Sequence, residues 1–130
     1  MNYKPIIIVA GEPNSIFFEI FFKVIKKKIK SPIILIGSEK LILNQAKILK
    51  KRINLNLINE NDLIEKRNKL KKINLINVNF KQTKIFDKIT SKSNKYISSC
   101  FKIAIKLIKN NISNKFINGP ISKKTFLKKK

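Results

Sequence analysis

KFINGPISK, residues 115–123, is the stretch that best indicates the fold of this chain. A short apolar run is stopped by Gly119-Pro120, and a polar, lysine-rich segment of helical character follows directly. This succession predicts a strand, a turn and a helix that meet at a corner, and in α/β sheets such corners lie where ligands bind. The first amides of the new helix would point outward there, and Lys123 would offer positive charge to an anion.

Two buried strands are indicated near the N-terminus. Residues 6–9 (IIIV) and 33–36 (IILI) are apolar at successive positions, which is typical of strands that are covered on both faces in a parallel sheet. A helix with Ser15 as its N-cap is expected after the first strand, and a second helix over residues 39–51 after Gly37-Ser38. In the first helix these apolar residues recur at helical spacing and are expected to face the core: Ile16, Phe17, Ile20, Phe21, Val24 and Ile25.

The middle of the chain gives weaker signals. Residues 53–58 alternate between apolar and polar side chains, as in a strand at a sheet edge. The highly charged residues 60–72 predict a short helix and a loop, and residues 73–80 a further strand. Residues 81–90 are expected to form a connecting loop.

The longest helix is expected next, capped by Ser91 or Ser93 and ended by Asn110-Asn111. Its predicted apolar face comprises Tyr96, Ile97, Cys100, Phe101, Ala104, Leu107 and Ile108. Since Cys100 lies within that face, we interpret it as a small buried hydrophobic residue and not as a reactive thiol.

The order of these elements predicts an α/β fold, a partial three-layer sandwich in which a mostly parallel sheet has helices on its faces. With 130 residues and 43% hydrophobic content, the chain is expected to form one α/β unit over residues 1–130. No apolar run approaches the ~20 residues of a membrane span. The N-terminus also lacks a signal-peptide pattern, so a cytoplasmic location without membrane association is expected.

The net charge of +23 raises the alternative of a small basic nucleic-acid-binding protein, which would bind duplex or single strands with steep salt dependence. Nearly all of this charge is lysine, and Arg52 and Arg67 are the only arginines. Lys, Asn, Ile and Phe all have codons rich in A and T, so a biased genome would enrich them together. Since helix-turn-helix spacing, exposed aromatic sets and finger-type metal patterns are also absent, a nucleic-acid partner is not favoured.

The residue inventory limits the chemistry available to the chain. It contains no histidine and one cysteine, so the usual nitrogen ligands of zinc, the usual general base and an internal disulfide are all missing. Residues 11–15 form neither a dinucleotide fingerprint nor a P-loop. Glu12, Glu19 and Lys123 fit either ordinary surface charges or binding residues. No catalytic or metal-binding residue is therefore assigned.

Taken together, the two turns resemble the 4-hydroxythreonine-4-phosphate dehydrogenases of pyridoxal phosphate biosynthesis. That family follows its first strand with Pro-Gly-Asp/Glu-Pro-Ala-Gly-Ile-Gly-Pro-Glu, where residues 10–19 read AGEPNSIFFE. A later strand in the family ends in Thr-Gly/Ala-Pro-Ile/Val-x-Lys, which residues 118–123 match except at Asn118. In the first turn and in the long helix these residues agree with the family: Gly11, Glu12, Pro13, Ile16, Glu19, Ser93, Tyr96 and Ala104. The departures in the first turn are Ser15, Phe17 and Phe18, which replace two glycines and a proline.

The resemblance implies the N-terminal part of an isocitrate/isopropylmalate dehydrogenase-like fold. It also implies NAD-dependent oxidation of a phosphorylated small molecule, 4-phosphooxy-L-threonine, with a divalent metal, followed by decarboxylation. The family works as a homodimer, and its histidine-threonine motif, metal-binding histidines and substrate-phosphate residues would lie beyond Lys130. Cleft-wall residues implied for this chain are Gly11, Glu12, Asn118, Gly119 and Lys123.

We therefore expect an N-terminal portion of such an enzyme that is inactive alone, with a C-terminal piece in trans as a candidate partner. NAD and a divalent metal are implied for the full-length family, and neither is assured for this chain. A chain that ends after a central strand would leave a sheet edge and two helix faces uncovered. Poor solubility or a loosened fold is expected as the consequence.

Overall fold

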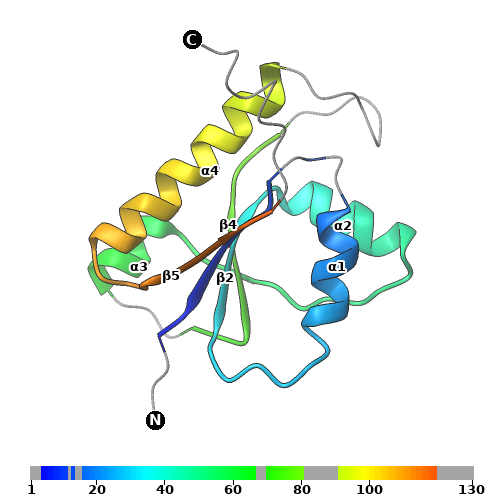
Figure 1. The fold of residues 1–130 in the computed structure, drawn as a ribbon, viewed down its shortest axis with the longest axis horizontal. Helices are drawn as coiled ribbons and strands as arrows, with labels where there is room; N and C mark the ends of the chain where they lie inside the picture. The colour runs from blue at the N-terminus through cyan, green and yellow to red at the C-terminus, as the bar shows by residue number, and fades with distance from the viewer. Residues whose placement is uncertain (1–3, 12, 14–15, 67–69, 81–90, 120–130) are drawn as a thin grey trace.

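The computed structural model describes residues 4–11, 13, 16–66, 70–80 and 91–119. The strands are β1 Ile6–Val9, β2 Ile33–Gly37, β3 Asn56–Leu57, β4 Ile73–Asn77 and β5 Lys115–Asn118. The helices are α1 Phe17–Val24, α2 Glu39–Ile48, α3 Glu60–Lys66 and α4 Ser91–Lys109. Within the described ranges the strands form one parallel sheet in the order β3-β4-β2-β1-β5 (Figure 1).

Helices cover both faces of this sheet. The helices α1 and α2 pack together on one face, whereas α3 packs against α4 and α4 lies over β1 and β2 on the other (Figure 1). Connections between parallel strands are right-handed, so the chain must change face when it changes direction along the sheet. It runs outward from β1 to β3 and then returns through β4 to β5. The predicted three-layer α/β fold is confirmed.

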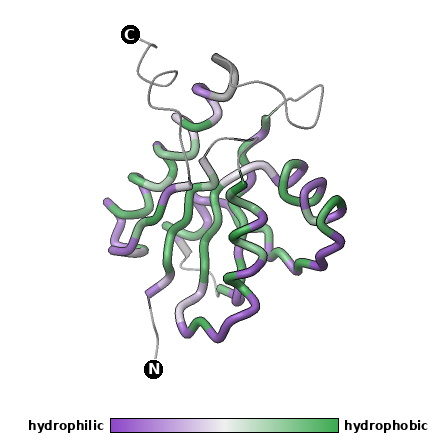
Figure 2. Tube along the Cα trace, turned by 45° about the vertical axis from the view of Figure 1, so that its right-hand side comes forward, coloured by the Kyte–Doolittle hydropathy of each residue, from purple (hydrophilic) through white to green (hydrophobic). Residues whose placement is uncertain are grey.

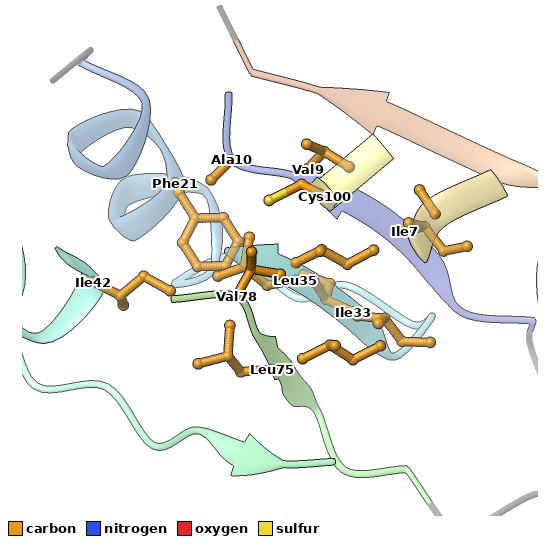
Figure 3. Close-up of a cluster of buried hydrophobic side chains, with 14 of the residues drawn as sticks. Ile7, Val9, Ala10, Phe21, Ile33, Leu35, Ile42, Leu75, Val78 and Cys100 are labelled. Carbon is orange, nitrogen blue, oxygen red and sulfur yellow. The ribbon is translucent and has the colours of Figure 1, made fainter. Parts of the chain in front are cut away.

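The centre of the sheet forms the core. Every residue of β2 is buried, because β1 and β4 flank it and helices lie on both of its faces. Figure 3 shows side chains of the central strands gathered with Ile42 of α2 and Cys100 of α4. Figure 2 shows hydrophobic residues along the central strands and hydrophilic residues in the surrounding turns. Among the described residues, no helix has both the length and the apolar content to cross a membrane.

The predicted core face of α1 is partly wrong. The helix buries Phe18, Phe21 and Phe22, while these members of the predicted face are largely exposed: Ile16 at 65%, Ile20 at 49% and Val24 at 43%. A phenylalanine ring removes more apolar area from water than a Val or Ile side chain, so the helix turns its rings inward. The helix begins at Phe17, and Ser15, its predicted cap, lies outside the described residues.

Two helices end with residues in the left-handed conformation. Lys50 and Asn111, with φ of 53° and 60°, follow α2 and α4 respectively. After α2, the Lys51 amide donates to the Ala46 carbonyl at 2.8 Å, which is the bond of a Schellman ending. This ending stops α2 at Ile48, three residues before the predicted end. A strand was predicted at the sheet edge over residues 53–58. Its edge position is confirmed, but β3 comprises only two residues.

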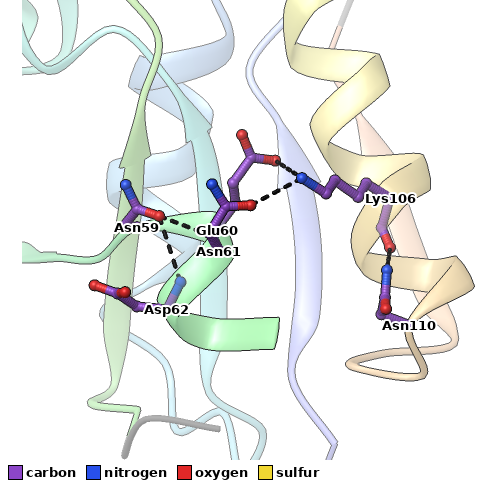
Figure 4. Close-up of polar contacts among 6 residues, drawn as sticks. All are labelled: Asn59, Glu60, Asn61, Asp62, Lys106 and Asn110. Carbon is purple, nitrogen blue, oxygen red and sulfur yellow. Dashed lines mark hydrogen bonds and ion pairs between the residues drawn. The ribbon is translucent and has the colours of Figure 1, made fainter. Parts of the chain in front are cut away.

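The contact between α3 and α4 is polar at its exposed side (Figure 4). Lys106 Nζ of α4 donates to Asn61 Oδ1 at 2.9 Å and lies 4.0 Å from a Glu60 carboxylate oxygen. Asn59 Oδ1 caps α3 by accepting from the amide of Asn61 at 2.8 Å. The helix that precedes β4 is thereby joined to the helix that follows it.

Asn74 is a buried polar residue between the apolar residues Ile73 and Leu75 of β4, and it is 0% exposed. Its Nδ2 donates to the carbonyls of Ile33 at 3.0 Å and Lys71 at 2.7 Å. Its Oδ1 accepts from the Lys71 amide at 2.9 Å and from Asn56 Nδ2 at 2.8 Å. This one side chain therefore ties β4 to β2, to the edge strand β3 and to the turn before β4.

Replacement of this residue, Asn74→Ala, is expected to lower the free energy of unfolding by about 2–4 kcal/mol, because it opens a cavity and leaves buried partners unsatisfied. Urea denaturation measures the loss. The matched control is Asn114→Ala at an exposed asparagine, which should change stability by less than about 0.5 kcal/mol. Equal effects of the two substitutions would contradict the role given to Asn74.

Cys100 is 0% exposed, as predicted, and burial raises the pKa of its thiol to about 12. The folded thiol should resist iodoacetamide at neutral pH and react once urea unfolds the chain. The unfolded thiol, with an ordinary pKa of 9.0, loses its proton before the folded one. Stability contributed by Cys100 should therefore be complete below pH ~9 and fall as the pH rises toward 12. The difference in unfolding free energy between the native chain and Cys100→Ala, measured across this range, isolates the effect.

Candidate functional site

The two glycine corners lie side by side at the carboxyl edge of the sheet. Strands β1 and β5 are parallel neighbours, with Val9 opposite Asn118. Just past this pair, the Gly119 amide donates to the Val9 carbonyl at 2.7 Å. Gly11 follows β1 after a single residue, so the turns after β1 and β5 leave the sheet at the same place. This is the edge of a parallel sheet at which α/β proteins bind ligands.

Packing within the protein explains both glycines. A Cβ atom on Gly119 would lie 2.1 Å from the Ala10 carbonyl oxygen and 2.9 Å from Cδ1 of Phe17. Those distances leave no space for any side chain. Gly11 has φ of 81°, in the left-handed region that glycine adopts without strain. Each glycine is thus required by the backbone around it, independently of any ligand.

The structure describes three of the five predicted cleft-wall residues and brings them together. Gly11 and Gly119 are buried, whereas Asn118 is exposed and its Nδ2 donates to the Gly119 carbonyl at 2.9 Å. Glu12 and Lys123 lie outside the described residues, as does the helix predicted after Pro120. Asn118 is therefore the predicted residue whose described side chain is open to a ligand.

The start of helix α2 lies at the same edge, and its first amides are satisfied within the protein. The Ser38 amide donates to Tyr96 Oη at 2.8 Å, and the Glu39 amide donates to Asn77 Oδ1 at 2.9 Å. The Leu41 amide donates to Ser38 Oγ at 3.3 Å, which makes Ser38 the N-cap. Since side chains already accept from these three donors, the amides of Ser38, Glu39 and Leu41 are not available to a phosphate.

Tyr96 joins the two layers of helices at this edge. Its side chain is 3% exposed, its ring lies 5.1 Å from that of Phe80, and burial raises the pKa of its hydroxyl above the ordinary value. A Cβ atom on Gly37 would lie 3.0 Å from Tyr96 Oη, so Gly37 makes room for the hydroxyl. Sequence reasoning placed Tyr96 in the core face of the long helix but missed this contact. Tyr96 and Ser38 are 58 positions apart, and no local pattern reports such a pair.

The described residues do not fit either cofactor that the family resemblance implied. They contain no group of three or more His, Cys, Asp or Glu side chains placed to hold a metal ion, and the whole sequence lacks histidine. The turn after β1 lacks the second and third glycines of a dinucleotide fingerprint. The helix start beside it is closed by Tyr96 and Asn77. The described part of the chain therefore supplies neither a metal-binding cluster nor a dinucleotide fingerprint.

Solved structures with this fold include two dehydrogenases. The 4-hydroxythreonine-4-phosphate dehydrogenase from Burkholderia phymatum superposes with a TM-score of 0.80 at 15% sequence identity, covering 97% of this chain and 39% of that one. The enzyme of the same name from Klebsiella pneumoniae gives a TM-score of 0.78 at 17% identity, covering 95% of this chain and 38% of that one. The shared fold is the isocitrate dehydrogenase-like fold. The chain thus spans about two fifths of the length of these structures, and no curated protein matches it.

A family model identifies the chain more directly. The model described as pyridoxal phosphate biosynthetic protein PdxA matches residues 28–130. This range includes the corner at Gly119, while the turn at Gly11, in which Ser15, Phe17 and Phe18 depart from the family pattern, lies before it. Since the match covers well over half of the sequence and the fold agrees with it, the chain belongs to the PdxA family of pyridoxal phosphate biosynthetic proteins.

Proposed function

We propose that this chain forms the N-terminal α/β part of an NAD-dependent 4-hydroxythreonine-4-phosphate dehydrogenase of pyridoxine and pyridoxal phosphate biosynthesis. Its substrate would be 4-phosphooxy-L-threonine. The supporting observation is the junction of the two corners, in which the Gly119 amide bonds to the Val9 carbonyl and Gly11 follows at the same edge. Family membership and the fold supply the reaction class.

The role of this chain in the proposal is to bind and orient the substrate. Gly11 and Gly119 would position the wall, because they let the turns after β1 and β5 lie against each other. Asn118 Nδ2 donates to the Gly119 carbonyl, and Asn118 Oδ1 would accept a hydrogen bond from the substrate. Glu12 and Lys123 complete the proposed wall, with Lys123 supplying positive charge for an anionic substrate.

The remaining parts of the reaction are assigned outside this chain. Because its described residues fit neither a metal nor a dinucleotide, neither metal chemistry nor hydride transfer is assigned to them. We propose that the histidines and the nicotinamide site come from a C-terminal piece acting in trans, and that the assembly is a homodimer with the cleft near its interface. The chain alone is proposed to be inactive for this reason.

The purified chain, mixed with NAD, Mg²⁺ and 4-phosphooxy-L-threonine, is expected to form no NADH. We expect a reading frame downstream of codon 130, or a separate gene, to encode a His-Thr segment and further histidines. The polypeptide from that frame, combined with this chain, should form NADH. Turnover by the chain alone would contradict the proposed division of the enzyme. A folded complex with the histidine-bearing polypeptide that forms no NADH would contradict the proposed activity.

In the active complex, Asn118→Ala should reduce kcat/KM at least about ten-fold, because one hydrogen bond to the substrate is lost. The control Asn114→Ala removes an exposed asparagine from the same segment and should leave kcat/KM within about two-fold. Steady-state NADH formation measures both variants. Equal kinetics for Asn118→Ala and the native chain would remove Asn118 from the proposed wall.

A graded pair of substitutions tests the glycine junction. Gly119→Ala should lower the free energy of unfolding by about 2–4 kcal/mol, because its Cβ would meet a backbone oxygen at 2.1 Å. Gly37→Ala should cost less, since its Cβ would meet the Tyr96 hydroxyl at 3.0 Å and a side chain can move more easily than backbone. Urea denaturation of both variants measures the order. A milder loss for Gly119→Ala than for Gly37→Ala would contradict the described junction.

A further inference from the structure

A pocket of about 450 Å³ lies at the amino edge of the sheet, opposite the glycine corners. Three segments line it: the end of α1, the loop before β3 and the turn before β4. Because all strands are parallel, residues that precede β3 and β4 lie at the far edge from those that follow β1 and β5. The pocket is therefore separate from the cleft wall proposed above.

The charges around this pocket all have one sign. Four of its ten lining residues are basic, against 30 of 130 in the whole chain, and none of the ten is acidic. The basic residues are Lys26, Arg52, Lys71 and Lys72, and all four are exposed. Arg52 is one of only two arginines in the sequence, and its guanidinium can bind two phosphate oxygens at once. Four cations with no acidic side chain among them therefore face one hollow.

Like charges approach one another closely at the rim. A hydrogen bond and charge repulsion from Lys26 lower the pKa of the neighbouring Lys51 ammonium. The acidic side chain of Glu60 pairs instead with Lys106, on the opposite face of the sheet. Lys26 lines the pocket and Lys51 does not, so an anion bound beside Lys26 would offset the repulsion between these two lysines.

Hydrogen bonds of a buried side chain hold part of the pocket wall in place. The buried side chain of Asn74 bonds to both backbone groups of Lys71 and to Asn56 Nδ2, and Lys71 and Asn56 both line the pocket. Four aliphatic side chains, Ile25, Ile53, Leu55 and Ile73, line the rest. The turn that carries Lys71 and Lys72 is thus tied to Asn56, the residue that follows the loop with Arg52. This distinguishes the pocket from a set of surface lysines on separate flexible segments.

We propose that this pocket binds a small anion with two or three linked phosphate groups. Its volume is that of a small-molecule site, and its four cations surround one hollow instead of following an extended track. The lining includes no aromatic side chain on which a nucleobase would stack, so the linked phosphates are the recognised group. The activity proposed for the carboxyl edge does not depend on this site.

Inorganic tripolyphosphate is the probe, titrated into the full chain by calorimetry at physiological ionic strength. The double variant Arg52→Gln/Lys72→Gln should weaken binding at least about ten-fold, because two charge-assisted contacts are lost. The matched control Lys40→Gln/Lys47→Gln removes the same charge from exposed positions on α2 and should change affinity by less than about two-fold. A second pair, Lys26→Gln/Lys71→Gln, should reproduce the loss if the first variant fails to fold.

Three results would overturn the proposal. Absence of binding by the native chain would do so. Equal weakening by the pocket and control variants would show diffuse attraction to the net charge. A single-stranded DNA oligonucleotide that binds more tightly than tripolyphosphate and depends on the same residues would make the site part of a nucleic-acid surface. Selective loss in the pocket variants, with the oligonucleotide weaker, supports a site for small polyphosphates.

Discussion

The parallel pairing of β1 with two neighbours is the constraint on which the remainder of the structure depends. Its residues are in register with β2 on one side and with β5 on the other, although β5 lies more than a hundred positions along the chain. Because this pairing is parallel, the turns after β1 and β5 leave the sheet at one edge. Where β1 and β5 end, the pairing brings Gly119 so close to the Ala10 carbonyl that position 119 has no room for a side chain. The adjacency of the two glycine corners at this edge follows from the pairing.

The parts of the fold that could be predicted are those with a strong local pattern. Continuous apolar runs located β1 and β2, and the periodic face of α4 located the residues that it buries. Helix α1 has apolar residues around most of its circumference, so periodicity could not decide which side is buried. Packing decided in favour of its phenylalanines. The predicted edge strand was longer than β3, because the alternation of apolar and polar side chains continues beyond the two residues that pair with β4.

The same distinction applies to the candidate site: features with a local sequence pattern were predictable, and those that join distant elements were not. The glycine corners were predictable because in each of them a glycine ends a short apolar run. Their adjacency follows from the sheet order. The closed start of α2 was not predictable, since its partners Asn77 and Tyr96 come from distant elements. The basic pocket at the amino edge has no motif either, because its lysines resemble the others in the sequence. It is visible only once α1, the loop before β3 and the turn before β4 are seen together.

Asn74 has a further consequence for the uniqueness of the sheet. Strands composed almost entirely of isoleucine and leucine can slide past one another and still bury comparable apolar surface, so hydrophobicity alone leaves their alignment poorly determined. The amide of Asn74 meets its partners on the neighbouring strands, Ile33 of β2 and Asn56 of β3, in one alignment only. Slippage of β4 would break these two interstrand bonds in the buried interior, a penalty that no exchange of one aliphatic side chain for another would impose. A single polar group thereby selects one sheet from a set of near-equivalent ones.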